Sequence, residues 1–354
     1  MFLISTRNFP PELGGMQNLM EGLSNALLNH GPVKVFAEAH NDAKNYDQNS
    51  NLNIDRVAGL KIFRKYRKAN LVKDFLESNE VRASFFDHWK SIENIEKNIL
   101  NKTKSFCLIH SKEINHKKGT FANKRILKAF NNIDLVVANS EYTKNLAVEI
   151  GIDENKIIVI NPGVFPPKEI DKSSIKEAEN LLKNKNPRLI TVSRFDKRKN
   201  HEKVIMALRN LKQMYPSIIY TCIGYGEEEE NIKKLTNELE LNEQVIFLKN
   251  ISHDLKNALV SKSNLFVMPS IIHKTSVEGF GIAYVEAAQY GIPSIGGKDG
   301  GASDAIKNNE TGMICDGNNL EEIYSSIDLI LKNNSYLEMG KKAKDYSTKF
   351  EWDN

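Results

Sequence analysis

Short apolar segments alternate with amphipathic helical segments along most of the chain. The apolar segments predict β-strands at residues 2–6, 33–37, 81–86, 106–110, 133–138, 157–160, 188–193, 218–223, 245–248, 265–268 and 293–295. Helices are predicted at residues 16–29 and 140–151, and further helices begin near Asn200, Glu227, Asp254, Ile282 and Ser303. This repeated order of strand and helix predicts an α/β fold with parallel, doubly wound sheets. Residues 40–79 interrupt it, because they are polar, and we expect them to be irregular.

The clearest break in the pattern is a cluster of prolines and glycine at residues 161–167. A chain of 354 residues exceeds the size at which one core usually stops growing, so we place a domain linker there. The prediction is two Rossmann-like domains that face each other across a cleft, at residues 1–164 and 165–340. The last segment, 341–354, is a candidate to return to the first domain.

The composition of the chain excludes some classes of function. The net charge of +4 is too small to indicate a nucleic-acid binder, which needs a concentrated basic face. The first residues become polar too soon for a signal peptide, and no apolar run reaches about 18 residues, so we expect a cytoplasmic protein. Cys107, Cys222 and Cys315 lie far apart in apolar surroundings, which favours buried free thiols over disulfides or a zinc site.

The most informative segment is Glu-Gly-Phe-Gly-Ile-Ala-Tyr-Val-Glu at residues 278–286. Gly279 and Gly281 precede a predicted helix, and a helix N-terminus behind such a loop favours an anion. Glu278 and Glu286 flank this anion site, and carboxylates accept hydrogen bonds from hydroxyl groups. A ligand that carries both phosphate and hydroxyls fits both features, and nucleotide sugars belong to that class.

A basic loop follows the predicted strand at residues 188–193. Arg194 could bind a phosphate through two hydrogen bonds, and Lys199 could add a point charge. A basic loop by itself is more often exposed to solvent without a ligand. Together with residues 278–286 it would complete a clamp for a diphosphate.

With these motifs, the chain resembles the retaining nucleotide-sugar glycosyltransferases of the GT-B fold, the group 1 glycosyl transferases that include sucrose-phosphate synthase and bacterial lipid mannosyltransferases. The resemblance covers nearly the whole chain and rests on an ordered set of motifs. They are Gly14-Gly15, Asn139-Ser140, Asn161-Pro-Gly163, Ser193-Arg194 with Lys199, Gly224-Tyr-Gly226, Pro269-Ser270, the two glutamates, Gly300-Gly301 and Thr311-Gly312.

The resemblance implies a role for each matching residue. Arg194 and Lys199 would bind the donor diphosphate and stabilise the departing nucleotide, and Glu278 and His110 would face the donor sugar. Glu286 would accept hydrogen bonds from the ribose hydroxyls. The remaining donor-side positions are the backbone of Phe280, Gly281 and Ile282, together with Gly224, Gly14 and Gly15.

The resemblance also implies transfer with retention of anomeric configuration from a UDP- or GDP-linked sugar, without a cofactor. The chain has no Asp-x-Asp triplet, so we expect no metal requirement. The acceptor would be a carbohydrate or a lipid-linked molecule in polysaccharide, glycolipid or glycoconjugate synthesis. The family often has an acidic residue soon after the first glycine pair, whereas this chain has Met16-Gln17, which leaves the contacts to the acceptor open.

Other interpretations use the same residues. A nucleotide-sugar epimerase or hydrolase needs the same donor contacts, and so does a binding protein without catalytic activity. Residues 61–68 interleave basic and apolar side chains, which is typical of a solvated face and also of a peripheral contact with the inner face of a membrane. This is also the segment that comes nearest to a nucleic-acid surface.

Overall fold

The computed structural model describes residues 1–12 and 14–353, and for Lys61 it describes the backbone alone. Contacts divide these residues into two units. The first consists of Met1–Phe165 and the residues from Trp352 onward, and the second consists of Pro166–Glu351. Among the described residues, none of the helices combines the length and the apolar character needed to cross a bilayer.

The first unit contains a parallel sheet of seven strands in the order β3-β2-β1-β4-β5-β6-β7. Its strands are β1 (Phe2–Ser5), β2 (Val33–Glu38), β3 (Asn53–Val57), β4 (Ala83–Phe86), β5 (Lys104–Ile109), β6 (Leu135–Ala138) and β7 (Ile157–Val159). Its helices are α1 (Gly15–Leu28), α2 (Ala43–Gln48), α3 (Lys61–Ser78), α4 (Trp89–Ile92), α5 (Lys97–Leu100), α6 (Phe121–Phe130) and α7 (Glu141–Glu149), with a 3-10 turn η1 (Glu154–Lys156).

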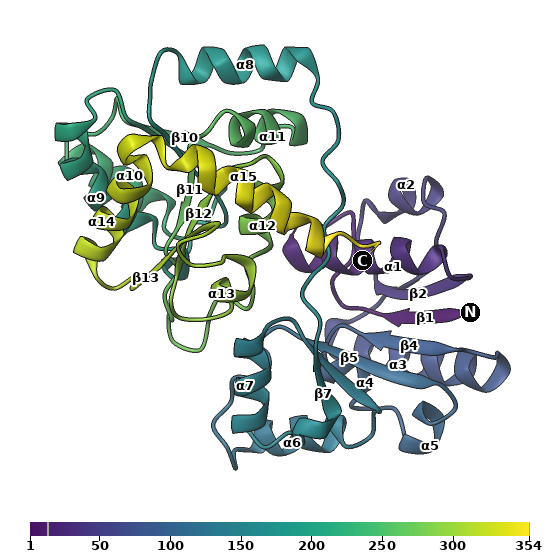
Figure 1. Ribbon diagram of the computed structural model, residues 1–354. Coiled ribbons are helices and arrows are strands. Elements are labelled where there is room, and N and C mark those ends of the chain that lie inside the picture. The colour runs from purple at the N-terminus through teal and green to yellow at the C-terminus, as the bar shows by residue number, and fades with distance from the viewer. Residues whose placement is uncertain (13, 354) are drawn as a thin grey trace. The chain divides into compact units, whose positions relative to one another are not determined.

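Helices cover both faces of this sheet (Figure 1), because successive strand residues point to opposite faces. Leu3 belongs to the core under α3 to α7, whereas Phe2 and Ile4 belong to the core under α1. All four residues of β1 are buried, as expected for a central strand of a parallel sheet. The α/β class and the doubly wound arrangement are therefore confirmed.

The second unit contains a parallel sheet of six strands in the order β10-β9-β8-β11-β12-β13. Its strands are β8 (Arg188–Val192), β9 (Ile219–Ile223), β10 (Val245–Leu248), β11 (Leu265–Met268), β12 (Ser294–Gly297) and β13 (Gly312–Cys315). Its helices are α8 (Lys172–Leu182), α9 (His201–Met214), α10 (Glu229–Glu238), α11 (His253–Ser261), α12 (Ile282–Gln289), α13 (Ala302–Ala305), α14 (Leu320–Leu331) and α15 (Tyr336–Ser347), with 3-10 turns η2 (Lys197–Lys199), η3 (Lys332–Asn334) and η4 (Thr348–Phe350).

The strand order places a topological switch point in each sheet, where the connections on either side leave in opposite directions. In the first unit it lies between β1 and β4, and in the second it lies between β8 and β11. Ligands of open parallel sheets bind beside the carboxyl ends of the strands at such a point. The fold therefore marks the residues after β1, β4, β8 and β11 as the places to look for a site.

The prediction that residues 40–79 are irregular is wrong. They form α2, β3 and α3, and β3 is the edge strand beside β2. Its five residues alternate between exposed and less exposed positions, so it lacks the continuous apolar run by which the buried strands are found. Ala69, Val72 and Leu76 bury one face of α3 at helical spacing, although the rest of this helix is strongly polar. Strand β13 was also not predicted from the sequence.

Single residues account for several local features of the structure. The Ser140 side chain accepts a hydrogen bond from the Thr143 N–H and so caps α7. Gly291 has a φ of 73° just after the end of α12, as a helix-terminating glycine does. The three cysteines are buried free thiols. The C-terminal helix α15 packs on α12 within the second unit.

Trp352 packs closely against α1 within the first unit, and this contact gives a test of the fold. A methyl group at Gly22 would lie 2.5 Å from the Trp352 ring nitrogen. We therefore expect Gly22→Ala to destabilise the first unit by about 1–3 kcal/mol through overpacking. In a Trp352→Ala background the same change should stabilise it by about 1 kcal/mol, because alanine is the better helix former.

Denaturant unfolding followed by the fluorescence of the buried Trp89 measures both effects. Gly15→Ala is the matched control, since its added methyl group would meet nothing within 4 Å. If Gly22→Ala changed the free energy of unfolding with the same sign in both backgrounds, the contact between Gly22 and Trp352 would be contradicted.

Candidate functional site

The switch point of the second sheet brings together the two segments that the sequence singled out. Residues 193–200 follow β8, and residues 269–281 connect β11 to α12. Lys199 Nζ and Arg198 Nη1 both donate to Glu278 Oε2, and the Arg198 contact is 2.5 Å long. The side chains of all three residues are only 10–12% exposed. A buried carboxylate thus joins the loop after β8 to the loop before α12.

Burial alone would raise the pKa of Glu278, but Lys199 and Arg198 outweigh it and lower the pKa to about 2. Burial also lowers the pKa of Lys199, and Glu278 opposes this change. For Arg198, burial is opposed by Glu278 and Asp196, and the pKa is raised. Asp196 lies 3.6 Å from Arg198 and 3.5 Å from Arg194, so the group beside the start of α12 is an ionised cluster of three cations and two carboxylates.

Backbone contacts fix Glu278 in this place. Its carbonyl oxygen accepts a hydrogen bond from the Gly301 N–H at 2.8 Å, and it forms a bridge with Gly300. Gly300 has a φ of 111°, and a Cβ there would lie 2.3 Å from that carbonyl oxygen. Only glycine meets both conditions. The Gly300-Gly301 motif therefore positions Glu278.

Asn200 holds the loop after β8 against two other strand ends. Its side-chain nitrogen donates to the carbonyl oxygens of Pro269 at 2.9 Å and Gly317 at 2.7 Å, and its backbone is left-handed with a φ of 63°. Sequence analysis treated this residue only as the start of a helix. Asparagine tolerates a left-handed backbone better than most residues, which was the one available signal.

The other predicted donor residues lie around this cluster in different environments. The Arg194 side chain is 69% exposed, and its Nη2 lies 3.5 Å from Asp196 Oδ2. Glu286 lies in the second turn of α12, half-exposed, with its Oε2 3.9 Å from Lys256 Nζ. A Cβ at Gly224 would lie 1.9 Å from the Ser193 carbonyl oxygen, so this glycine permits close packing of the Arg194 loop.

The start of α12 has the geometry expected of an anion site. Gly281 is the N-cap residue with a φ of 93°, and Ile282 begins the helix. The first N–H groups of a helix lack partners within it, and they lie at the positive end of its dipole. The Phe280 side chain, by contrast, is buried against Phe350, with ring centroids 5.5 Å apart. Only the backbone of Phe280 is therefore available to a ligand.

The predicted residues of the first unit are Gly14, Gly15 and His110. Gly14 is the N-cap residue of α1, which begins at Gly15. His110 follows β5, and its backbone N–H donates to Glu113 Oε1 at 2.5 Å. Its Nε2 is buried and has no hydrogen-bond partner among the described residues, and burial lowers the pKa of this imidazole.

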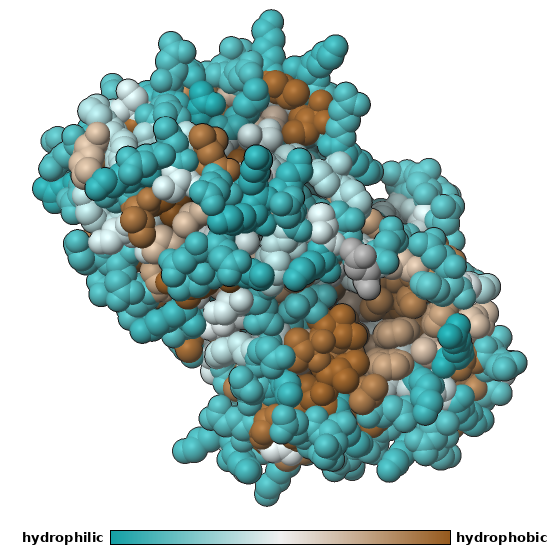
Figure 2. Space-filling view, viewed as in Figure 1, coloured by the Kyte–Doolittle hydropathy of each residue, from teal (hydrophilic) through white to brown (hydrophobic). Residues whose placement is uncertain are grey.

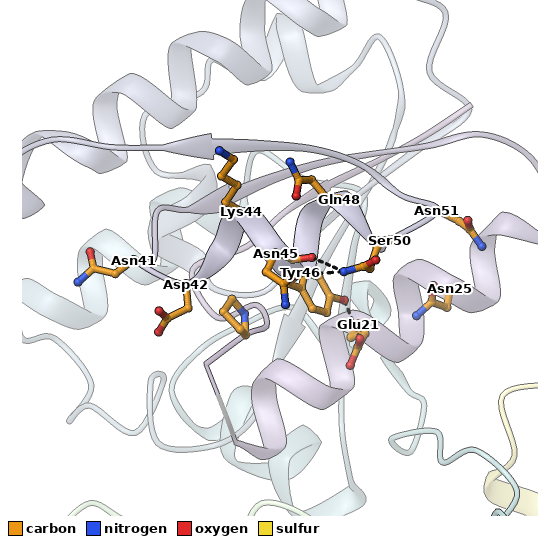
Figure 3. Close-up of a pocket in the computed structure, with 12 residues that line it drawn as sticks. Glu21, Asn25, Asn41, Asp42, Lys44, Asn45, Tyr46, Gln48, Ser50 and Asn51 are labelled. Atoms are coloured by element: carbon orange, nitrogen blue, oxygen red, sulfur yellow. Dashed lines mark hydrogen bonds between the residues drawn. The ribbon is translucent and has the colours of Figure 1, made fainter.

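A polar hollow of about 880 Å³ also lies in the first unit, between α1 and α2 (Figure 3). Amide and carboxylate side chains dominate its lining, and Tyr46 donates a hydrogen bond to Glu21 at 2.6 Å within it. None of the predicted site residues lines this hollow. Its one basic side chain is Lys44, so it lacks the clustered cations that phosphate binding requires.

Arg198 is the main residue of the cluster that sequence reasoning missed. It lies in a basic run, Lys197-Arg-Lys199, where nothing in the pattern distinguishes a buried side chain from an exposed one. In the structure Lys197 is exposed, whereas Arg198 is buried beside Glu278. The described residues contain no group of three or more His, Cys, Asp or Glu side chains arranged to hold a metal ion.

Comparison with known proteins identifies the family of the chain. The family model described as "Glycosyl transferases group 1" matches residues 171–349, and "Glycosyltransferase Family 4" matches residues 13–166. The "GDP-mannose-dependent alpha-(1-6)-phosphatidylinositol monomannoside mannosyltransferase" of Mycolicibacterium smegmatis is 23% identical over 98% of this chain and 93% of its own length.

Two solved structures show the same fold over nearly the whole chain. HepE of Anabaena in complex with UDP has a TM-score of 0.81 at 17% identity and covers 99% of this chain and 96% of its own. Sucrose-phosphate synthase of Thermosynechococcus elongatus has a TM-score of 0.79 at 18% identity and covers 100% of this chain and 96% of its own. The two sheets and these neighbours confirm the expected GT-B fold.

His201, at the start of α9, makes stability depend on pH. Burial, together with Lys199, lowers the pKa of its imidazole to about 3, so the folded protein keeps it neutral while the unfolded chain protonates it below about pH 6.5. Because the unfolded state then binds more protons, the free energy of unfolding should fall as the pH decreases from about 6.5 toward 3. The expected slope is up to about 1.4 kcal/mol per pH unit.

Urea unfolding at pH 7, 6 and 5, followed by circular dichroism, tests this. His201→Gln should flatten the pH dependence, whereas His30→Gln, at an exposed position, should leave it unchanged. An identical slope in His201→Gln and the unsubstituted protein would contradict the assignment.

Proposed function

Because this chain belongs to the glycosyl transferases group 1 family, we propose that it moves a sugar from a UDP- or GDP-linked donor to an acceptor hydroxyl with retention of anomeric configuration. The observation that carries the proposal is the convergence of Lys199, Arg198 and Glu278 at the β8/β11 switch point, beside the start of α12. Arg194, 69% exposed on the same loop and 3.5 Å from Asp196, would turn from this carboxylate toward a diphosphate.

Cleavage of the bond between sugar and phosphate develops positive charge on the sugar and negative charge on the departing diphosphate. Arg194 and Lys199, with the first N–H groups of α12, would stabilise the negative charge. The acceptor hydroxyl would attack on the face that the nucleotide leaves, and a phosphate oxygen would receive its proton. The chain's own cations would then stabilise the departing diphosphate, as a metal ion does in other glycosyltransferases. We therefore propose that this protein requires no metal ion.

The two glutamates have different proposed roles. Glu278 is buried and ionised at the cluster, so it would face the donor sugar and govern transfer more than binding. Glu286 is half-exposed on α12 and would accept hydrogen bonds from the ribose hydroxyls, which affects donor affinity. The contact of His110 with the sugar stays a prediction from the resemblance.

We propose a lipid-linked acceptor and a role in glycolipid synthesis. A relative that covers nearly the whole chain is named for phosphatidylinositol monomannoside as acceptor and for GDP-mannose as donor. Among structural neighbours, HepE is seen with UDP and, in a further complex, with UDP-glucose. The proposed donor therefore carries either UDP or GDP. The second proposed class of acceptor, after lipid-linked molecules, is a polysaccharide precursor.

Helix α3 supplies the proposed contact with the inner face of the membrane. Its cations are already engaged, since Arg64 and Arg67 donate to the carbonyl oxygens of Gly59 and Ala58. Leu60, Ile62, Phe63 and Tyr66, however, are large apolar side chains that are 48–69% exposed. Elsewhere hydrophilic residues cover most of the face shown in Figure 2. An apolar stripe next to basic residues fits the headgroup region of a bilayer.

The proposed reaction is tested by incubating the protein with a panel of UDP- and GDP-sugars, with and without phosphatidylinositol as the acceptor, in the presence of a chelator, and measuring nucleotide diphosphate release. We expect Arg194→Ala and Lys199→Ala to slow turnover about 100-fold, by analogy with the loss of one oxyanion donor. Lys197→Ala, on the same loop but exposed, is the matched control and should retain activity. Proton NMR of the sugar product reports whether the anomeric configuration is retained.

Full turnover by Arg194→Ala would contradict the assignment of the site. Donor consumption that never depends on an acceptor would favour a hydrolase or epimerase, and donor binding without turnover would favour a binding protein.

The membrane contact is tested by sedimentation with vesicles of phosphatidylcholine and phosphatidylglycerol. We expect Ile62→Glu to reduce the bound fraction at least fivefold, because a carboxylate replaces apolar area at an anionic surface. Leu337→Glu is the control, since Leu337 is equally exposed but lies on α15. Equal losses in both variants would contradict a specific role for α3.

A further inference from the structure

The switch point of the first sheet gathers a cluster of charged side chains of its own. Residues 6–8 follow β1 and residues 87–90 follow β4, and these two strands are the neighbours between which the strand order reverses. A ligand of the first unit is therefore expected beside these two loops.

Asp87 ties the two loops together. Its Oδ2 accepts hydrogen bonds from Thr6 Oγ1 at 2.9 Å and from the Arg7 backbone N–H at 2.6 Å, and its Oδ1 accepts from Ser91 Oγ at 3.1 Å. Asp87 is 1% exposed. Since neutral groups occupy its oxygens, this carboxylate forms no direct ion pair with a basic side chain among the described residues.

The basic side chains around these loops outnumber their carboxylate partners. Glu38 is shared by Arg7 at 3.7 Å, Arg64 at 3.4 Å and Lys68 at 3.9 Å. Glu93 is shared by Arg125 at 2.6 Å and Lys65 at 3.6 Å. Six cations thus surround three carboxylates when Lys90 and Asp87 are included: Arg7, Arg64, Lys65, Lys68, Lys90 and Arg125.

Among these six cations, Lys90 shows the excess of positive charge most clearly. No carboxylate among the described residues lies within ion-pair distance of it, and its ammonium instead lies 5.2 Å from the centre of the Trp89 ring. Burial is the main cause that lowers its pKa, and the nearby charges of Arg7, Arg125 and Lys65 lower it further. The folded chain therefore holds these four cations together against their mutual repulsion.

An independent sign of a ligand comes from the histidines beside this cluster. His88 lies two residues after β4, and burial lowers its pKa to about 3; Asp87 opposes this change, and Arg7, Lys90 and His110 add to it. The buried Nε2 of His110 lacks a hydrogen-bond partner among the described residues. Buried polar atoms in folded proteins nearly always have a partner, so this nitrogen is open to a ligand, although the charged groups that act on His110 are the carboxylates of Glu113 and Asp87.

We propose that the β1/β4 switch point binds a phosphate group through Arg7 and Lys90, and that the acceptor of the reaction is a phosphate-bearing molecule. A phosphate supplies the missing negative charge, and its oxygens match both the guanidinium fork of Arg7 and the ammonium of Lys90. Arg7 is suited to this because its side chain is 34% exposed. The identification of this ligand as the acceptor rests on the proposed function, whereas the phosphate site does not.

Two kinds of acceptor carry such a group, a soluble phosphorylated molecule and the phosphodiester of a lipid headgroup. Glycerol 1-phosphate represents the first and vesicles of phosphatidylinositol in phosphatidylcholine represent the second. Phosphorus NMR titration of the full chain measures the binding of glycerol 1-phosphate, and sedimentation measures the binding of vesicles.

We expect saturable binding of at least one probe that weakens at least fivefold in Lys90→Gln and in Arg7→Gln. Lys90→Arg should retain binding, because it keeps the charge, and circular dichroism checks that each variant is folded. Lys102→Gln is the matched control, since this exposed lysine lies just before β5, at the amino ends of the parallel strands and away from the carboxyl ends of β1 and β4.

Each outcome has a definite meaning. Loss of glycerol 1-phosphate binding in Lys90→Gln supports the site with a soluble acceptor, and loss of vesicle binding alone supports it with a lipid headgroup. Binding of both probes that is unchanged in Lys90→Gln, or equally weakened in Lys102→Gln, overturns the proposal. Nucleotide diphosphate release from the donor panel is measured in parallel, so that failure of this site is distinguished from failure of the proposed transferase activity.

Discussion

The candidate donor site depends on one buried ion pair network, in which Glu278 accepts from both Lys199 and Arg198. Such a network is weak evidence for stability, because the loss of hydration offsets much of the Coulomb attraction. Its clearer consequence is that it fixes the positions of the two segments that it joins. It links the loop after β8 to the start of α12. It also holds several cations in one place, where a diphosphate would supply negative charge in addition to that of Glu278. The contacts of the chain itself thus organise this site.

The same topology operates in both units. Each sheet reverses its strand order once, and at each reversal two loops converge that carry more cations than carboxylates. In the second unit the excess lies beside a helix N-terminus, which suits the nucleotide diphosphate of a donor. In the first unit it lies among buried histidines, with α3 contributing both Lys65 to the cluster and an exposed apolar stripe. A phosphorylated, lipid-linked acceptor would satisfy both features of the first unit.

The sequence allowed the prediction of most buried strands, because central parallel strands such as β1 and β9 are continuous apolar runs. It failed at β3, an edge strand with alternating exposure, and at α3, whose buried face is small. Glu278 and Lys199 were found through local motifs. The roles of Arg198 and Asn200 could not be found in this way, because they depend on contacts with residues 80 and 69 positions away. The excess of cations around Lys90 is likewise assembled from the loop after β1 and from α3, α4 and α6, and no single segment reveals it.

The central claim is that a nucleotide sugar binds at the β8/β11 switch point. Calorimetric titration of the purified chain with UDP- and GDP-sugars tests it directly. The account predicts saturable binding of at least one donor, at least 30-fold weaker in Arg194→Gln, as the loss of about 2 kcal/mol from a charge-assisted phosphate contact implies. Lys197→Gln should bind as the unsubstituted chain does. The absence of binding by every donor, or equal affinity in Arg194→Gln and the unsubstituted chain, would contradict the account.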